Sequence, residues 1–227
     1  MTIAVVIPTL DAAARLPETL RALDRARASG LVGETIVADG GSTDGTERIA
    51  RAAGAAWCPA PCGRGSQLAA GAARATSCWL LFLHADTILT PGWEAVAARW
   101  IAAPDSVGRA GYFRFRLDDE RGAARRLARV VAWRARRFGL PYGDQGLLIH
   151  RDLLAAVGGW RAMPLMEDVD LVRRIGRRRL DALDADAVTS AARYRRDGYL
   201  RRSARNLVCL SLYFAGVPPT ILRRLYG

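Results

Sequence analysis

The chain has 227 residues, of which 51% are hydrophobic and 25% are charged, a composition typical of a folded domain and not of a disordered segment. Its formal charge is +12 and every basic side chain is an arginine, which favours anionic partners such as phosphates, nucleotides or acidic lipids. The sequence contains no zinc-finger spacing, RNA-binding aromatic motif or basic arm, which argues against nucleic acid as the partner.

The cysteines and the first residues indicate the compartment. The cysteines match neither a metal-binding quartet nor a disulfide framework, so a reducing, cytoplasmic location is expected. The first residues are apolar but lack the basic start and the small-residue cleavage site of a signal peptide. We therefore interpret Ile3–Thr9 as a first strand that is buried in the domain.

Strand and helix patterns alternate after this strand. Leucines at helical spacing predict a helix over residues 15–29, and residues 34–39 read as a second buried strand. A turn rich in glycine and hydroxyl side chains follows, over residues 39–46, and leads into another helix. Strands that alternate with helices over such short distances predict an α/β fold with a parallel sheet and right-handed crossovers.

Asp39 ends the second strand, where its carboxylate could accept hydrogen bonds from a ribose hydroxyl or a base N–H. It could equally serve only to shape the turn, and the sequence leaves both interpretations open. The first strand is followed by Pro8-Thr9-Leu10-Asp11, without the glycine triplet that admits a pyrophosphate in dinucleotide-binding enzymes. An oxidoreductase is therefore disfavoured.

The next segments carry the first candidate chemistry. Arg64 lies in a loop before an alanine-rich helix over 66–76, where it could hold a phosphate with backbone N–H groups or simply face solvent. A short apolar strand then runs from Trp79 and stops at His84 and Asp86. Ligands bind at the carboxyl ends of strands in open α/β sheets, so these two side chains are placed to meet a substrate or a metal.

The second half alternates in the same way. A helix is expected over 91–103, and residues 110–117 form a half-buried strand with Tyr112 on its polar side. A basic amphipathic helix over 122–138 could lie on anionic lipid, although such a face is more often solvated. A further strand is expected over 147–149.

Polar residues flank this last strand. Asp144 and Gln145 precede it and could orient hydroxyl groups or only form a turn. Trp160 could pack against a substrate or belong to the core. Glu167 and Asp168 open a helix that runs to residue 178, where the helix dipole alone would favour acidic residues.

The C-terminal part is expected to contain a strand over 180–188 and then a basic segment, with arginines before the apolar run 207–217. This run is shorter than the ~20 residues that span a bilayer. Three interpretations stay open: a core-packed helix with a solvated basic flank, a helix that lies on a membrane, or arginines that clamp donor phosphates.

Four of these segments, in this order, resemble the family 2 glycosyltransferases of the nucleotide-sugar-binding GT-A fold: 6–10, 37–46, the strand that ends in His84-Ala85-Asp86, and 166–170. The chain is most similar to small bacterial members that share the His-Ala-Asp triplet and a Gly-Asp-Gln-Gly segment, some of which are linked to arsenosugar biosynthesis. The resemblance implies one α/β domain with a Rossmann-like, mostly parallel central sheet flanked by helices. Its expected parts are a nucleotide-sugar-binding half over 1–110, an acceptor-side half over 111–190 and a basic C-terminal helical segment over 191–227.

The same resemblance implies a metal-dependent, inverting hexosyltransferase. The donor would be a UDP- or GDP-sugar, and the hydroxyl acceptor could be lipid-linked, at the inner face of a membrane. Asp86 matches the last carboxylate of the family's Asp-x-Asp motif, which binds Mn²⁺ or Mg²⁺, whereas His84 departs from that motif. Imidazole is a better ligand for Mn²⁺ than for Mg²⁺, so metal ligation by His84 would favour Mn²⁺; otherwise His84 hydrogen-bonds a phosphate or a neighbouring group.

The resemblance also implies roles for the remaining candidates. Asp168 would be the general base that deprotonates the acceptor, and Glu167 its partner. The expected acceptor-side residues are Asp144, Gln145 and Trp160. The expected donor-binding residues are Pro8, Thr9, Asp11, Asp39, Gly41, Arg64 and Ala85.

Two other functions are compared with that of a transferase. A nucleotidyltransferase would need a glycine-rich, basic triphosphate loop directly after the first strand, where this chain has Pro8-Thr9-Leu10-Asp11. A non-catalytic nucleotide-sugar or anionic-membrane-binding module would not need to retain Asp86 and Asp168. Both alternatives are therefore weaker predictions.

Overall fold

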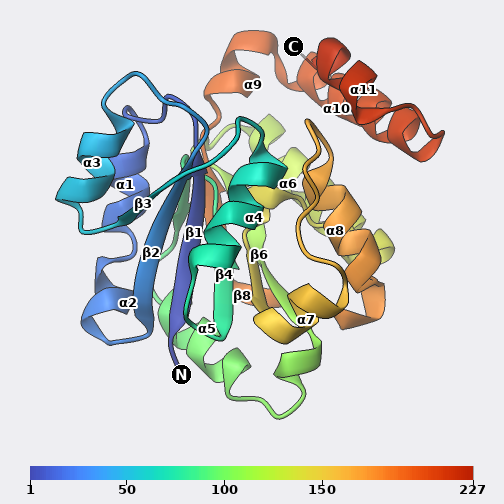
Figure 1. The fold of residues 1–227 in the computed structure, drawn as a ribbon. Coiled ribbons are helices and arrows are strands. Elements are labelled where there is room, and N and C mark those ends of the chain that lie inside the picture. The colour runs from blue at the N-terminus through green and yellow to red at the C-terminus, as the bar shows by residue number, and fades with distance from the viewer. Residues whose placement is uncertain (227) are drawn as a thin grey trace.

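The computed structural model describes residues 1–226, and within them eight strands form one sheet (Figure 1). The spatial order is β3-β2-β1-β4-β7-β6-β8-β5, with β3, β2, β1 and β4 all parallel. β7 runs antiparallel to both β4 and β6, β6 pairs in parallel with β8, and β5 is antiparallel to β8. The predicted α/β class with a Rossmann-like, mostly parallel sheet is confirmed. The strands are β1 (Ile3–Thr9), β2 (Val32–Asp39), β3 (Ala56–Pro59), β4 (Trp79–Phe82), β5 (Thr87–Leu89), β6 (Ala110–Leu117), β7 (Leu147–His150) and β8 (Leu180–Thr189).

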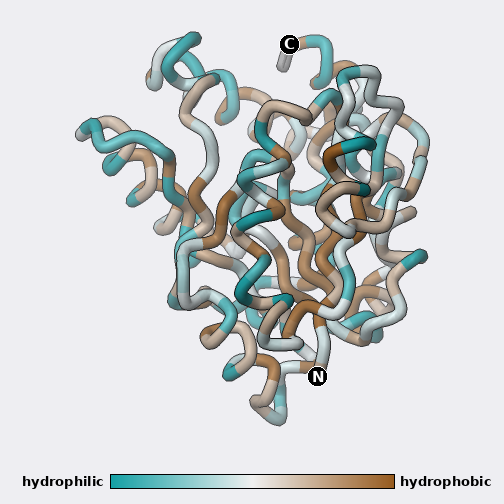
Figure 2. The backbone as a smooth tube through the Cα atoms, turned by 90° about the vertical axis from the view of Figure 1, so that its left-hand side faces the viewer, coloured by the Kyte–Doolittle hydropathy of each residue, from teal (hydrophilic) through white to brown (hydrophobic). Residues whose placement is uncertain are grey.

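Helices cover both faces of the sheet, and the core lies between them and the strands. Ile3, Val5 and Ile7 of β1 point into one apolar cluster, while Ala4 and Val6 point into another, because successive side chains of a strand alternate between faces. In Figure 2 the hydrophobic segments gather in the middle of the molecule and the hydrophilic ones at its outside. The helices are α1 (Leu16–Arg21), α2 (Asp24–Ala28), α3 (Thr46–Ala52), α4 (Arg64–Arg74), α5 (Trp93–Ile101), α6 (Gly122–Phe138), α7 (Arg151–Ala156), α8 (Glu167–Ile175), α9 (Ala192–Asp197), α10 (Tyr199–Phe214) and α11 (Pro219–Tyr226).

Several element boundaries differ from the sequence prediction. The helix expected over 15–29 is divided into α1 and α2 by a turn in which the N–H of Leu23 bonds to the carbonyl of Leu20. The helix expected to reach residue 178 ends at Ile175, because Gly176 adopts a φ of 84° that a helix cannot contain. Tyr112 was expected on the polar side of its strand, but it is buried together with its neighbours.

Helix α4 lies unusually close to the sheet and to the loop before α8. A Cβ atom on Gly71 would lie 2.3 Å from Val6 Cγ1, and one on Gly65 would lie 2.1 Å from the carbonyl oxygen of Arg161. Only glycine permits these approaches. They fix the first turn of α4, which carries Arg64, against the segment that leads to Glu167.

The C-terminal helices form the expected basic helical segment and pack on the second half of the domain. Cys209 and Leu210 of α10 and Leu222 of α11 share an apolar cluster with Val169 and Val172 of α8. In residues 1–226 we find no helix whose length and apolar character would allow it to cross a membrane. The cysteines Cys58, Cys62, Cys78 and Cys209 are free thiols, as expected for a chain without a disulfide framework.

Candidate active site

A cavity of about 140 Å³ lies beyond the carboxyl ends of β4 and β8. Its walls come from parts of the chain that are far apart in sequence: the start of α4, the segment after β4, the turn before β7, the start of α8, the end of β8, and α9 with α10. The lining residues are Arg64, His84, Asp86, Tyr142, Asp144, Leu165, Met166, Asp168, Val169, Thr189, Ser190, Arg193, Tyr194, Arg202 and Asn206. The structure therefore brings together five of the candidate residues predicted from sequence: Arg64, His84, Asp86, Asp144 and Asp168.

Gly143 lies next to the part of the cavity wall that carries His84, Asp144 and Asp168, which we call the acidic wall. Its N–H donates to Asp168 Oδ2 over 2.8 Å, while Asp168 Oδ1 accepts the N–H of Val169 over 2.7 Å. A Cβ atom on Gly143 would lie 2.5 Å from His84 Nε2 and 3.5 Å from Asp168 Oδ2, so both side chains lie close to this glycine, where a side chain of its own would point. Both carboxylate oxygens of Asp168 are thus oriented by backbone donors.

Burial changes the proton affinity of two groups in this wall. Burial holds the pKa of His84 well below its ordinary value, and the positive charges of Arg64 and Arg193 lower it further. His84 is therefore neutral near pH 7, with a lone pair available. Burial also raises the pKa of Asp144 to about 6, and the nearby carboxylates of Asp168 and Asp86 act in the same direction against the arginines.

These residues fit a divalent cation that also binds ligand oxygens. Asp144 Oδ1 is buried without a hydrogen-bond partner among the described residues, and Asp86 and Asp168 share the same cavity. Across the described part of the chain, no three His, Cys, Asp or Glu side chains converge as a complete metal site. Mg²⁺ and similar ions usually take only one or two protein carboxylates and complete their coordination with water and substrate phosphates. The carboxylates of Asp86, Asp144 and Asp168 suit a metal ion that is coordinated partly by the protein and partly by substrate phosphates.

Glu167 lies behind the cavity wall. It is 2% exposed, and its Oε1 accepts a charged hydrogen bond from Arg64 Nη1 over 3.1 Å. Burial raises the pKa of Glu167 and Asp168 adds to this effect, while Arg64 opposes it. The ion pair joins the start of α4 to the start of α8 and so holds Arg64 at the cavity.

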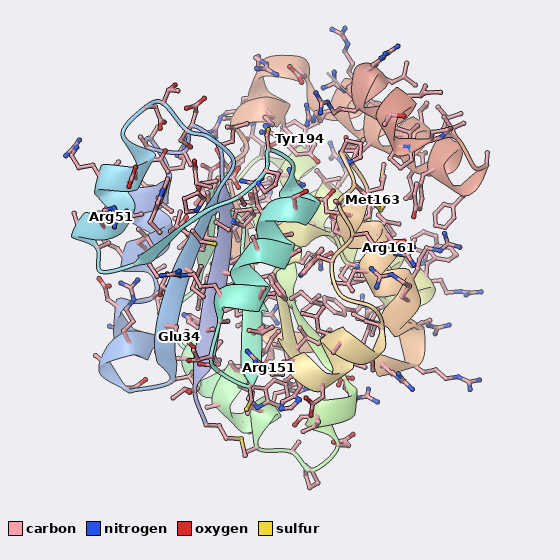
Figure 3. The ribbon with its side chains drawn as sticks, viewed as in Figure 1. Glu34, Arg51, Arg151, Arg161, Met163 and Tyr194 are labelled. Carbon is pink, nitrogen blue, oxygen red and sulfur yellow. The ribbon has the colours of Figure 1, made fainter. Side chains whose placement is uncertain are left out.

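Trp160 also lies beside the cavity and not in its wall. Its ring meets that of Phe82 edge-on, with 5.0 Å between the ring centroids, and it lines a smaller neighbouring cavity with Glu167. In Figure 3, Arg161 and Met163 mark the loop that follows Trp160, on the α8 side of α4. The indole Nε1 is buried without a hydrogen-bond partner among the described residues.

The first and second strands end in loops that are tied together. Asp39 is 3% exposed, and its carboxylate accepts hydrogen bonds from Thr9 Oγ1 (2.8 Å), Gly41 N (2.8 Å), and both the N–H (2.7 Å) and the hydroxyl (2.5 Å) of Ser42. Burial raises the pKa of Asp39, but these hydrogen bonds outweigh it, so the net shift is downward. These contacts show that Asp39 shapes the turn, while its hydrogen bonding to a nucleoside stays a prediction.

Asp11 completes the connection between the two loops. Its Oδ1 accepts the N–H of Thr43 over 2.8 Å, and its own N–H donates to Ser42 Oγ over 2.8 Å. Asp11 does this with a φ of 48°, a left-handed conformation that is uncommon outside glycine. The loops after β1 and β2 therefore form one preformed edge.

Besides Glu167 and Trp160, seven of the residues predicted from sequence do not line the cavity. Gln145 is 1% exposed; its Nε2 donates to the carbonyl of Phe113 and its Oε1 accepts the N–H of Tyr142, so its side chain holds the turn and is not free to orient a hydroxyl. The carbonyl of Ala85 accepts the hydroxyl of Thr19. The others belong to the loop edge at the ends of β1 and β2: Pro8, Thr9, Asp11, Asp39 and Gly41.

For the cavity wall that follows β8, sequence reasoning offered only a clamp on donor phosphates by arginines such as Arg193, as one of three open interpretations. Ser190, Arg193 and Tyr194 lie at the end of this strand and in α9, and Arg202 and Asn206 come from α10. Figure 3 shows Tyr194 at the top of the molecule, above α4. The available signal was Thr189-Ser190 at the end of a predicted strand, a position where ligands bind in open α/β sheets.

An open α/β sheet with an acidic, arginine-flanked cavity at its carboxyl edge is the scaffold of a ligand-binding α/β enzyme. Residues 4–162 match the family model described as glycosyl transferase family 2, and the chain belongs to this family. The predicted family is thereby confirmed. Among curated proteins, none matches the chain.

Solved structures share the fold. Glucosyl-3-phosphoglycerate synthase from Mycobacterium tuberculosis, in complex with Mn²⁺, UDP and glucosyl-3-phosphoglycerate, is 21% identical, with 83% of this chain and 70% of that chain covered and a TM-score of 0.58. Mannosyl-3-phosphoglycerate synthase from Rubrobacter xylanophilus is 17% identical, with 95% of this chain and 75% of that chain covered and a TM-score of 0.64. A further mycobacterial protein is 26% identical, with 83% and 65% covered and a TM-score of 0.56. The subgroup with the His-Ala-Asp triplet and its link to arsenosugars remain predictions.

Proposed function

We propose that the protein transfers a sugar from a nucleoside-diphosphate donor to a hydroxyl acceptor, with the help of a divalent metal ion. The observation that carries this proposal is the meeting of Asp86, His84 and Asp168 with Arg64 in one cavity of a family 2 glycosyltransferase. The mycobacterial synthase was also solved with Mn²⁺ and UDP-glucose, which supports a uridine donor and Mn²⁺ for this chain.

In this proposal Asp86 holds the metal ion, and the neutral imidazole of His84 is its second protein ligand. A divalent ion at this place would supply Lewis-acid stabilisation of the diphosphate leaving group. Arg64, which is anchored by Glu167, adds positive charge on the same side of the cavity. The edge formed by Pro8, Thr9, Asp11, Asp39 and Gly41, together with Ala85, would bind the nucleoside part of the donor.

Asp168 is the proposed general base. Its carboxylate faces the cavity and is held by the N–H groups of Gly143 and Val169, so it can accept the acceptor's hydroxyl proton without a change of rotamer. One base and direct attack on the anomeric carbon would invert that centre. Asp144 and Trp160 remain proposed acceptor-side groups, whereas Glu167 acts through Arg64 and is a positioning residue. A cytoplasmic location is part of this proposal.

Ligand-induced thermal stabilisation tests the donor site. Melting temperatures would be measured with UDP, GDP and their sugar conjugates in the presence of Mn²⁺, Mg²⁺ or EDTA, because a ligand that binds only the folded state raises its stability by mass action. We expect a shift that needs metal, is larger with Mn²⁺ than with Mg²⁺, and is lost in Asp86→Ala. Asp105→Ala, which removes a 75%-exposed carboxylate, is the matched control and should keep the shift.

Two outcomes would count against the proposal. If no nucleotide raises the melting temperature of the wild type with any metal, the donor site is absent. If nucleotides bind but no sugar is released from any bound donor, the non-catalytic module that was weighed above is the better description. Membership of a glycosyltransferase family already argues against a nucleotidyltransferase.

A further inference from the structure

Helix α10 carries an apolar stripe on the side that faces solvent. Leu200, Leu207, Val208 and Phe214 are 89%, 63%, 53% and 47% exposed. At 3.6 residues per turn these positions lie on one side of the helix. Figure 1 shows α10 and α11 at the end of the molecule opposite the N-terminus, at its outer edge.

The opposite side of α10 packs against the rest of the domain. Cys209 and Leu210 are buried in the cluster with α8, while Arg202 and Asn206 line the cavity. Helix α10 is therefore apolar on its outer side without any packing reason within the described chain. α11, which packs against α10, exposes two further apolar side chains, Ile221 and Leu225, which are about half exposed. We call these six apolar residues of α10 and α11 the outer face.

The charge around the outer face has one sign. From Gly198 to Leu225 the chain has arginines but no Asp or Glu. Arg202 and Arg205 are bonded to Asp197. Arg201, Arg223 and Arg224 are exposed and form no ion pair with a described residue.

A further basic side chain lies at the C-terminal end of the stripe. The guanidinium of Arg173, on α8, lies 4.9 Å from the ring centroid of Phe214. The apolar side chains of the outer face are thus flanked by guanidinium groups at the start of α10, on α11 and beside Phe214. This pattern of apolar contact and unpaired positive charge is the one that binds a helix to the interface of an anionic bilayer.

We propose that the outer face of α10 and α11 docks on the surface of an anionic lipid bilayer. A second copy of this chain is a poorer occupant, because a two-fold contact of this face with itself would bring the same arginines together without an acidic group between them. Anionic headgroups neutralise these arginines, and the leucine, valine and phenylalanine side chains can enter the boundary with the acyl chains. Since Arg202 and Asn206 line the cavity from the inner side of α10, docking brings the cavity close to the headgroup layer.

Vesicle co-sedimentation of the full chain, without nucleotide or metal, tests this inference. The vesicles are phosphatidylcholine alone or phosphatidylcholine with about 30% phosphatidylglycerol. We expect the wild type to sediment with the anionic vesicles only. The triple variant Leu200→Ser, Leu207→Ser, Val208→Ser should partition at least about tenfold less, while Val107→Ser, which alters an exposed valine at the other end of the fold, should bind as the wild type.

A second pair of variants separates this face from the net charge of +12. Arg201→Gln, Arg223→Gln, Arg224→Gln removes three charges beside the outer face, and Arg25→Gln, Arg48→Gln, Arg99→Gln removes three exposed charges from α2, α3 and α5. Only the first set should weaken binding about tenfold. Equal losses in both sets would show attraction by net charge alone and overturn the proposal.

Other results would also overturn it. Unchanged vesicle binding by the serine variant would do so, as would a concentration-dependent dimer of the wild type that the serine variant abolishes, because the face would then belong to a second copy. The substituted side chains are exposed, so each variant should keep the wild-type melting temperature. Because the assay contains no nucleotide, its failure would leave the proposed transferase function untouched, and the nucleotide shift tests that function separately.

Discussion

At the scale of single residues, the arrangement of side chains in the acidic wall depends on Gly143. This glycine lies beside both His84 and Asp168 and donates its N–H to the carboxylate of Asp168. The close approach of His84 Nε2, 2.5 Å from where a Cβ would be, leaves no room for any side chain. The separation of the proposed metal ligand and the proposed base is therefore set by the absence of one methyl group.

Gly143→Ala is expected to displace His84 and to reduce the nucleotide- and metal-dependent thermal shift, with a smaller change in the stability of the unliganded protein. Gly143 has no left-handed backbone, so the effect is steric. Gly108→Ala is the matched control, because a Cβ at Gly108 meets no atom within 4 Å. Titration of both variants with UDP and Mn²⁺ measures the difference, and equal affinities would show that His84 does not need its present position.

Asp168→Asn should preserve donor binding and abolish turnover. The amide keeps the shape of the carboxylate but cannot accept a proton, and loss of a general base typically costs at least about a hundredfold in rate. UDP release from a UDP-sugar in the presence of water as acceptor provides a readout that needs no knowledge of the natural acceptor. Asp184→Asn, at an 85%-exposed side chain, is the control. Wild-type turnover in Asp168→Asn would remove Asp168 as the base.

Sequence alone named several residues that the fold brings into one cavity, but not how the hydrogen-bonding capacity of the other candidates is used. His84 and Asp86 could be named because they follow a buried strand at the edge where ligands bind, Asp144 because it precedes a strand, and Asp168 because it opens a helix in a segment that resembles the family. Asp39 and Gln145 could not be assigned in the same way. The side chain of Asp39 is satisfied by backbone N–H and hydroxyl groups of two loops, and that of Gln145 by backbone groups of β6 and of its own turn. Such contacts are not visible in a linear pattern.

At the scale of elements, Glu34 joins β2 to the connection between α4 and β4. Its carboxylate accepts hydrogen bonds from the N–H and hydroxyl groups of both Thr76 and Ser77, and Figure 3 labels it near the lower end of β2. Burial raises the pKa of Glu34, but the four donors outweigh burial and bring it below its ordinary value of 4.5. The charged form is thus the one that stabilises the fold.

Glu34→Gln should lower the free energy of unfolding by about 1 kcal/mol at pH 7. The contribution of a carboxyl whose folded pKa is depressed is complete above its unfolded pKa and is lost as pH falls through the folded value. The difference between variant and wild type should therefore shrink below pH 4.5. Urea unfolding at several pH values measures it, and a difference that is independent of pH would show that the charge has no part.

Gly71→Ala tests the close contact between α4 and β1. The added methyl group would overlap Val6, and such overpacking typically costs about 1–3 kcal/mol. Gly122→Ala, at the start of α6, meets only the end of the Arg126 side chain and should not destabilise the protein. Chemical denaturation compares the two, and equal stabilities would mean that α4 can move away from the sheet at no cost.

Long, strongly patterned elements were predictable, whereas short ones were not. The limits of β1, β6 and α6 follow from the apolar patterns of their sequences. β3 and β5, with four and three residues, are too short to show a period, and α7 follows β7 without a break. The antiparallel insertion of β7 beside β4 depends on pairing between distant segments, which no local pattern encodes.

At the scale of the whole molecule, the cavity is lined by residues from all three stretches into which the sequence divided the chain, 1–110, 111–190 and 191–227. Binding of UDP and Mn²⁺ should therefore slow hydrogen exchange not only after β4 but also in α9 and the first half of α10, which carry Arg193, Arg202 and Asn206. Exchange mass spectrometry can resolve these peptides. Protection confined to residues before 110 would mean that the C-terminal wall takes no part in donor binding.

The basic side chains around the outer face are all arginines, and the chain contains no lysine. An arginine stays protonated at any pH at which a protein stays folded, and it is not a substrate for acetylation as lysine is. The positive charge of this surface can therefore be tuned neither by alkaline conditions nor by acylation of amine side chains. Whatever controls its attraction to anions must act from outside the protein, through ionic strength or through the charge of the partner.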